Sequence, residues 1–146
     1  MATHAVQTVM IAAQPAEVMS VIGDFAAYPN WVEALSLCDV LSRHQDGSAD
    51  QVRFVVSTGI VQDDYVLDYT WAPSRLRVDW TLVSSQVMSS QDGSYTLAPQ
   101  GRDTEVTYAL SVELSIPMLA MFKRQAEKMI MDMALRSLKA RVEAGG

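Results

Sequence analysis

The chain of 146 residues is long enough to bury a core of its own but leaves little room for a second domain. Apolar residues make up 49% of it and charged residues 19%, and no apolar run is long enough to span a bilayer. The start lacks the pattern of a secretory signal, and the single cysteine, Cys38, cannot form an internal disulfide. We therefore expect one cytoplasmic domain over residues 1–146.

The net charge of −6 argues against a general nucleic-acid-binding protein, because phosphate contacts need a basic surface. The charge is unevenly placed: residues 117–146 hold six basic and three acidic residues, a net of +3, which leaves −9 on residues 1–116. We interpret the basic stretch as a solvated helix face. Contact of this face with an anionic membrane or partner is the less favoured alternative.

The N-terminal quarter predicts a strand followed by two short helices. Residues Thr3 to Ile11 are rich in β-branched and apolar side chains and predict the strand. A helix should begin at Pro15, since proline suits the first helical turn. A second helix is expected from Phe25 to Tyr28 and should end at Pro29, because the residue before a proline avoids helical geometry.

After Trp31 the apolar residues recur with a period of two, which predicts strands separated by turn residues. Short connections imply an antiparallel meander. The alternation leaves one face of the sheet apolar, and this face must be covered. The predicted strands are Leu37 to Arg43, Gln51 to Thr58, Tyr65 to Trp71, Arg75 to Ser84, Val87 to Leu97 and Thr104 to Ser115.

The cover is a helix expected from Pro117 to about Glu143, which spans roughly 40 Å. Spacings of three and four residues predict its apolar stripe, and Met131 lies off that stripe. The stripe consists of Leu119, Phe122, Ala126, Met129, Ile130, Met133 and Leu138. Together these elements predict an α+β fold in which a seven-stranded curved antiparallel sheet wraps around the last helix.

Three stretches carry a resemblance to a known family: VMIAAQPAEVMSVIGDFAAYPNW, DGSYTLAPQGRDTEVTYAL and KRQAEKMIMDMALRSLKARVE. In these stretches the chain resembles the START-like (SRPBCC) superfamily, the polyketide cyclase/dehydrase and lipid-transport family. It looks most like the small uncharacterised actinobacterial members. The resemblance implies a helix-grip fold with a cavity between the long helix and the concave sheet. Carriers, sensors and enzymes share this fold, so function has to be argued from the site.

Large side chains with polar ends, glutamine and flexible methionines are the candidates for lining such a cavity. The alternative is that the methionines fill the core and that the polar groups bond one another. Gly93 should leave space beside Gln91. The predicted lining residues are Tyr28, Trp31, Tyr65, Tyr69, Trp71, Trp80, Gln91, Tyr95, Tyr108, Met121, Phe122, Met129 and Met133.

No set of residues with the pattern of a catalytic or metal centre is apparent in the sequence. His4 and His44 are expected to be exposed, and neither pairs with Cys38 or a serine. The adjacent Asp63 and Asp64 predict a solvated turn. We therefore predict no metal, no cofactor and no catalytic residue.

The favoured function is a binding or carrier protein for a small hydrophobic ligand, such as a lipid, a quinone or a polyketide-like aromatic. An enzyme of the polyketide cyclase, aromatase or dehydrase type is the main alternative, although Arg53 and Asp68 do not support a cyclase site. A module that binds a membrane or protein through the last helix is the third. The ligand remains open, as does the choice between monomer and homodimer.

Overall fold

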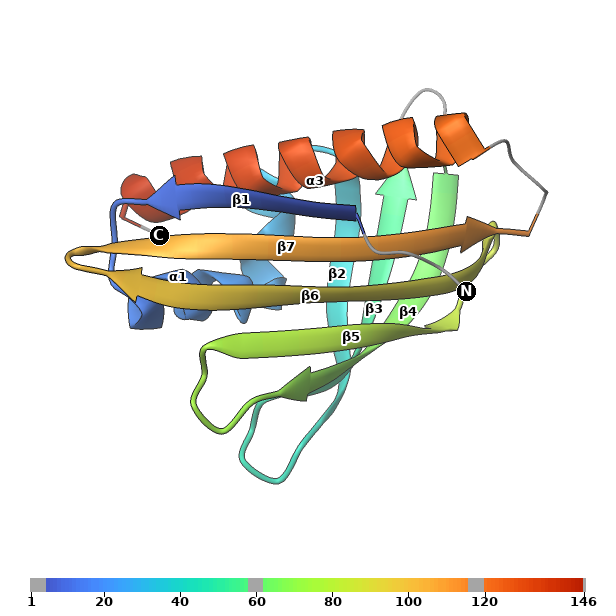
Figure 1. Cartoon of the computed structure of the whole chain (residues 1–146). Coiled ribbons are helices and arrows are strands. Elements are labelled where there is room, and N and C mark those ends of the chain that lie inside the picture. Colours follow the sequence, from blue (N-terminus) through green and yellow to red (C-terminus); the bar gives the residue numbers. More distant parts are fainter. Residues whose placement is uncertain (1–4, 58–61, 116–119, 146) are drawn as a thin grey trace.

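The computed structural model describes residues 5–57, 62–115 and 120–145, with the side chains of 120–122 left aside. The order of strand, short helices, six strands and long helix confirms the predicted α+β class (Figure 1). The elements are β1 (Ala5–Ile11), α1 (Pro15–Ile22), η1 (Phe25–Ala27), α2 (Tyr28–Trp31), β2 (Leu35–Arg43), β3 (Ala49–Ser57), β4 (Gln62–Trp71), β5 (Arg77–Ser84), β6 (Met88–Gln100), β7 (Asp103–Leu114) and α3 (Ala120–Glu143).

The seven strands form one sheet in the order β1-β7-β6-β5-β4-β3-β2. All neighbouring strands run antiparallel, as short connections require. In Figure 1 the sheet bends strongly, so that β2, β3 and β4 cross behind β6 and β7, while α3 lies along the edge that carries β1. This curvature gives the sheet an inner face, turned toward the helices, and an outer face.

The segment around Pro29 differs from the sequence-based prediction. Pro29 does not end a helix but lies in the first turn of α2, where no backbone N–H is needed from it. Tyr28 has helical angles of φ −52° and ψ −44°, although a proline follows it. The Tyr28 hydroxyl donates to the Ile22 carbonyl oxygen, so tertiary contacts stabilise this geometry.

The buried stripe of α3 also differs from the prediction: Leu138 is buried as expected, but the prediction was wrong for the middle of the helix. Met131 is only 1% exposed, whereas Met129, Ile130 and Met133 are exposed by 63%, 46% and 55%. The residues of α3 that pack inward are Glu127, Met131, Leu135, Leu138 and Val142. Apolar side chains occupy two faces of this helix, and periodicity alone cannot say which of them meets the sheet.

The two edge strands of the sheet are protected in different ways. On β1, Lys139 Nζ donates to the Met10 carbonyl oxygen at 2.8 Å, and the Ala12 N–H donates to Glu143 Oε2 at 2.9 Å. Polar side chains of α3 thus satisfy the open edge of β1. On β2 the pairing with β3 is interrupted by irregularities near both ends, which shorten the regular edge. Capping and bulges both discourage pairing with another chain.

Candidate functional site

Aromatic side chains from four strands meet on the inner face of the sheet. The ring centroid of Trp80 lies 5.8 Å from that of Tyr69, 5.4 Å from Tyr95 and 5.6 Å from Tyr108. Because alternate residues of a strand share a face, this cluster follows directly from the period of two. The structure brings together on this face the predicted residues Tyr65, Tyr69, Trp71, Trp80, Gln91, Tyr95 and Tyr108.

Phe25 of η1 joins the short helices to this cluster and is not among the residues predicted to line the cavity. It is 1% exposed, and its ring centroid lies 4.9 Å from that of Tyr69 and 6.2 Å from that of Trp71. Tyr28 and Trp31 pack behind it, with 5.0 Å between their centroids. The signal available in the sequence was an apolar aromatic held between two helix breaks. These aromatics cover one part of the inner face.

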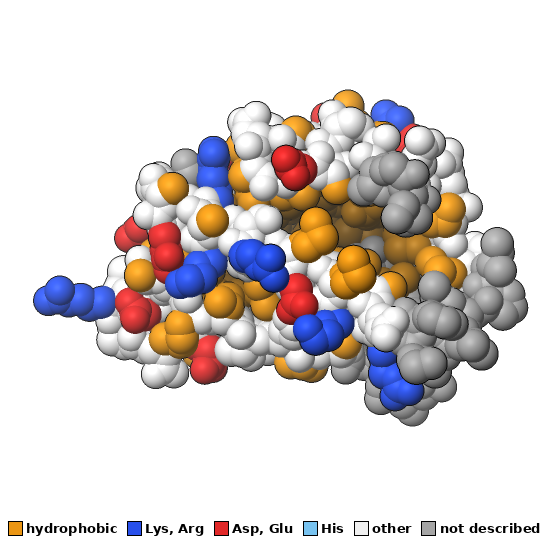
Figure 2. Space-filling model, turned by 90° about the horizontal axis from the view of Figure 1, so that it is seen from above, with side chains coloured by type: hydrophobic (Ala, Val, Ile, Leu, Met, Phe, Trp, Pro, Cys, Tyr) orange, Lys and Arg blue, Asp and Glu red, His pale blue; other side chains and the backbone are white. Residues whose placement is uncertain are grey.

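Burial changes along the inner face and defines two ends. At the closed end, Val78 and Val106 are 0% exposed and Leu97 is 3% exposed. At the open end, inner-face side chains are half-buried and therefore reach solvent; they are Val56, Tyr65, Leu82, Met88 and Leu114. Figure 2 shows a hollow on the face that carries α3, with hydrophobic side chains gathered in it and along its edge.

Trp80 lies between the two ends and is held from two sides. A Cβ atom on Gly93 would overlap Cε2 and Cζ2 of the Trp80 indole, so the ring lies directly on the Gly93 backbone. The indole Nε1–H donates to Gln91 Oε1 at 2.9 Å, and Gln91 Nε2 lies 3.4 Å from Met88 Sδ. The expectation that Gly93 leaves free space is therefore wrong, because the indole fills that space.

The tyrosines and the cysteine of the inner face are uncharged at neutral pH. Burial raises the pKa of Tyr65, Tyr69, Tyr95 and Tyr108 well above the ordinary value for tyrosine. It also raises the pKa of Cys38 to about 12, and nearby Asp39 adds to this shift. The tyrosines therefore keep their hydroxyl protons and can both donate and accept hydrogen bonds.

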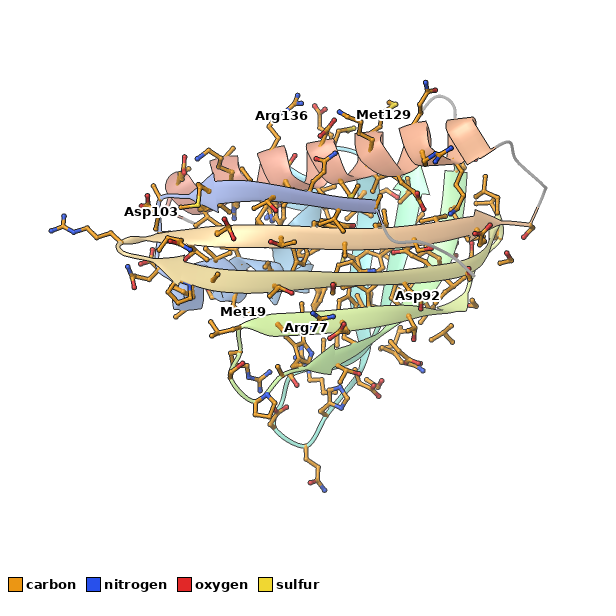
Figure 3. All side chains as sticks on the ribbon, viewed as in Figure 1. Met19, Arg77, Asp92, Asp103, Met129 and Arg136 are labelled. Carbon is orange, nitrogen blue, oxygen red and sulfur yellow. The ribbon has the colours of Figure 1, made fainter. Side chains whose placement is uncertain are left out.

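The charged side chains of the middle strands pair with one another on the outer face. Arg53 Nε and Nη2 donate to the two carboxylate oxygens of Asp64 at 2.9 and 2.7 Å. Arg77 and Asp79 form a similar pair, with 2.8 Å between Nη2 and Oδ1. A depression of about 480 Å³ lies on this outer face beside Arg77, Asp79 and Asp92. Figure 3 labels Arg77 and Asp92 on the neighbouring strands β5 and β6. The cation of this depression is already neutralised, so the inner face is the better candidate.

One buried carboxylate stabilises α3 near the open end. Glu127 is 2% exposed, and its Oε2 accepts a hydrogen bond of 2.8 Å from the Val112 N–H. Lys123 Nζ lies 3.4 Å from this oxygen and 3.2 Å from Glu113 Oε1. Among the described residues, the pairing of β7 with β1 extends to Leu110, and Glu127 accepts the hydrogen bond of the Val112 N–H two residues further on.

A second buried carboxylate, Asp63, was wrongly expected in a solvated turn. It is 5% exposed and lies in β4. Its two oxygens accept hydrogen bonds of 2.7 Å from the Ser85 hydroxyl and 3.0 Å from the Gln86 N–H. Asp63 therefore orders the turn between β5 and β6 and is occupied by structural bonds.

Among the described residues, no group of three His, Cys, Asp or Glu side chains could hold a metal ion. His44 follows β2 directly and is exposed, and its Nε2 lies 2.8 Å from the Tyr69 carbonyl oxygen. His4 lies outside the described residues. No described helix is long and apolar enough to cross a membrane.

Four predicted lining residues belong to α3. The side chains of Met121 and Phe122 lie outside the described part of the structure. Met129 and Met133 are exposed, and Figure 3 shows Met129 extending from α3 away from the sheet. Their place on a supposed inward stripe was the reason for selecting them. That reason does not hold, because the inward stripe runs through Met131.

A curved antiparallel sheet, closed by one long helix and short helices over an aromatic inner face, defines the helix-grip class of proteins. Within this class the chain belongs to the family described as polyketide cyclase/dehydrase and lipid transport, which matches residues 2–143. Members of this family bind hydrophobic ligands or act as polyketide cyclases. No curated protein sequence matches the chain at a significant level.

Solved structures show the same fold at low sequence identity. A START superfamily protein from Mycobacterium smegmatis is 23% identical with a TM-score of 0.91, over 97% of this chain and 99% of that one. A protein from Thermus thermophilus is 20% identical with a TM-score of 0.81, over 99% of both chains. The Zhui aromatase/cyclase from a Streptomyces species is 15% identical with a TM-score of 0.78, over 100% and 99%.

Proposed function

We propose that the protein binds one small, uncharged, apolar ligand in the hollow at the open end of the inner face. The observation that carries this proposal is the change in burial along a single apolar face. Side chains at the closed end are shielded from solvent, whereas Leu82, Met88 and Leu114 remain half-buried. Apolar side chains left partly exposed inside a concave surface gain stability when a ligand covers them.

The chemistry of the inner face favours an uncharged ligand. A buried carboxylate or ammonium group needs a partner of opposite charge. The buried carboxylates Asp63 and Glu127 are already engaged by hydrogen bonds within the protein. Among the described inner-face residues there is no Lys or Arg, and the arginines of β3 and β5 pair with aspartates on the outer face. The protonated tyrosines offer neutral hydrogen bonds instead. A hydroxyl or carbonyl oxygen on an otherwise apolar or aromatic molecule fits these groups.

A cyclase, aromatase or dehydrase activity is the second candidate, and the family description and the similarity to the Streptomyces aromatase/cyclase favour it. General acid–base catalysis works best with a group whose pKa lies near the working pH. The raised pKa values of Tyr65 and Tyr108 place these hydroxyls far from that range. Binding without chemistry is therefore the better supported function for the described residues.

A matched pair of variants tests the binding proposal with the uncharged fluorescent probe N-phenyl-1-naphthylamine. Leu82 lies on the inner face, and its neighbour Val83 points to the opposite face and is 47% exposed. We expect the probe to bind the native protein, to lose at least tenfold in affinity with Leu82→Trp, which fills the hollow, and to bind Val83→Trp as before. Absence of probe binding to the native protein, or equal effects of both variants, would overturn the proposal.

Contact with an anionic membrane has one observation in its favour. Met129, Ile130 and Met133 protrude from α3 beside exposed Arg124 and Arg136. Apolar side chains next to cations are typical of interfacial helices. Sedimentation with phosphatidylglycerol vesicles at low salt tests this candidate, with phosphatidylcholine vesicles as the control. Equal or no sedimentation with the two lipids excludes it.

A further inference from the structure

We propose that Trp80, seated on Gly93, is the stop that limits how deeply a ligand enters the hollow, and that it thereby sets the ligand length the protein accepts. This inference rests on the proposed binding function and assigns specificity to one side chain. Three independent features of the structure support it: the contact with Gly93, the hydrogen bond to Gln91 and the packing on either side of the indole.

The contact with Gly93 places the indole across two strands. Trp80 of β5 and Gly93 of β6 are direct partners in the sheet, and the ring occupies the volume that a side chain at position 93 would need. Glycine is required here because of this close approach rather than for backbone flexibility. The indole therefore extends sideways over the neighbouring strand and forms a broad surface across the inner face.

The hydrogen bond from Trp80 Nε1 to Gln91 Oε1 fixes the rotation of the ring. Gln91 is itself placed by its contact with Met88 Sδ at 3.4 Å. On the other side, the rings of Tyr69 and Tyr108 lie 5.8 and 5.6 Å from the indole, measured between centroids. A side chain held by contacts on several sides cannot swing aside at small cost, so it acts as a wall.

The packing on either side of Trp80 shows where the hollow ends. Two residues earlier on β5, Val78 is 0% exposed, and Leu97 and Val106 behind it are 3% and 0% exposed. Two residues later, Leu82 is half-buried. Space is therefore filled behind the indole and partly open in front of it. A ligand that enters from the open end meets the indole first, and its length is limited by this contact.

Truncation of the indole should lengthen the hollow toward the closed end. Trp80→Ala removes the ring and leaves a cavity that the surrounding tyrosines close only in part. Trp80→Phe removes less volume, keeps an aromatic ring and serves if the alanine variant fails to fold. Gly93→Ala should have the opposite effect, because its Cβ atom would overlap the indole and force the ring off the β6 backbone into the space over the inner face.

The experiment measures displacement of N-phenyl-1-naphthylamine by straight-chain primary alcohols of increasing length. We expect an optimum length for the native protein and a shift of that optimum by roughly four carbon atoms with Trp80→Ala. A smaller shift in the same direction is expected with Trp80→Phe, and a shift toward shorter alcohols with Gly93→Ala. The control is Val78→Ala, which removes volume behind the stop and should leave the optimum unchanged.

The outcomes separate this inference from the binding proposal. If the native protein binds neither the probe nor any alcohol, the binding proposal itself fails. If the native protein binds but Trp80→Phe and any folded Trp80→Ala keep the native optimum, the depth stop is wrong while binding stands. An equal shift with Val78→Ala would also overturn it, because general loosening of the core would then explain the change.

Discussion

The closed and open ends of the inner face are built from the same kinds of residue, yet they differ in what covers them. At the closed end, where α1 contacts β6 and β7, Val78, Val106 and Leu138 are 0% exposed. At the open end, Leu82 and Leu114 are half-buried. In Figure 1, α1 lies at the end of the sheet where β6 and β7 are joined, opposite the N-terminal end of α3.

This difference shows how one sheet serves both stability and binding. Complete burial of apolar side chains supplies most of the free energy of folding, and Val78, Val106 and Leu138 at the closed end are completely buried. The open end contributes less to folding and keeps apolar surface that a ligand can cover. The helix α3 spans both ends, because Glu127 and Met131 in its first half and Leu138 and Val142 in its last turns all pack inward.

The largest change in the free energy of unfolding is expected at alkaline pH. This change tests whether water reaches the tyrosines in the middle of the inner face. All five tyrosines have a pKa raised chiefly by burial. Above about pH 10 the unfolded chain loses tyrosine protons that the folded chain keeps. The free energy of unfolding should therefore be unaffected by these groups below pH 10. Above it, the free energy should fall by up to about 1.4 kcal/mol per pH unit for each tyrosine.

Urea unfolding at pH 8 and pH 11 measures this effect. Tyrosine absorbance near 295 nm, an ordinary marker of the phenolate, should rise together with unfolding rather than before it. Ionisation of several tyrosines in the folded protein would show that water reaches the middle of the inner face. The distinction between the two ends would then have to be abandoned.

Truncation of single side chains of α3 tests which face of this helix packs on the sheet. Leu138→Ala at the closed end should lower the free energy of unfolding by about 2–5 kcal/mol, because it leaves a cavity in a filled core. The matched change Met133→Ala, at a side chain 55% exposed, should alter it by less than about 0.5 kcal/mol. Urea unfolding of both variants decides the point, and similar losses would refute the assigned buried stripe.

Glu127 provides a test near the boundary of the two ends. Glu127→Ala leaves the Val112 N–H without its acceptor and should cost about 1–3 kcal/mol. Glu127→Gln retains an acceptor oxygen and should recover most of this loss. Urea unfolding compares the two variants. If the glutamine variant is as unstable as the alanine variant, the contribution comes from the charge and Lys123 rather than from the hydrogen bond to the sheet.

The smallest effect is expected at the capped edge of β1. Lys139→Ala removes the donor to the Met10 carbonyl oxygen, and the exposed position limits the loss to less than about 1 kcal/mol. Hydrogen exchange should nevertheless accelerate at the amides of β1, since the edge of the strand opens more often. Unchanged exchange in β1 would show that this cap does not hold the edge.

Much of the fold could be predicted, because its signals are local. Alternation over Tyr65 to Trp71 and Val106 to Leu114 placed the aromatic and aliphatic side chains on one face. The predictions were wrong at residues whose type is compatible with more than one local structure. Pro29 is compatible with the end or the beginning of a helix, and the contact of Tyr28 with Ile22 selects the second. Asp63 resembled a turn residue, although its partners lie in the turn after β5.

The candidate site was predictable only in part. The aromatic residues of the inner face could be predicted from the alternation of side chains along a strand. Whether Met129 and Met133 line the cavity depended on the orientation of α3, which the sequence does not give. Phe25 was missed because its contacts with Tyr69 and Trp71 join residues more than 40 positions apart. The role of Gly93 was misread because a sequence does not reveal which neighbouring side chain will lie over a glycine.

The sequence by itself determined the order of the elements, the antiparallel sheet and its apolar face, since these depend on period, turn residues and short connections. The tertiary structure alone decided three further features: the buried face of α3, the end of the sheet that is closed, and the packing of the Trp80 indole on the Gly93 backbone. The physical reason is that packing and hydrogen bonding of buried groups depend on which distant side chains meet. Local propensity does not carry that information.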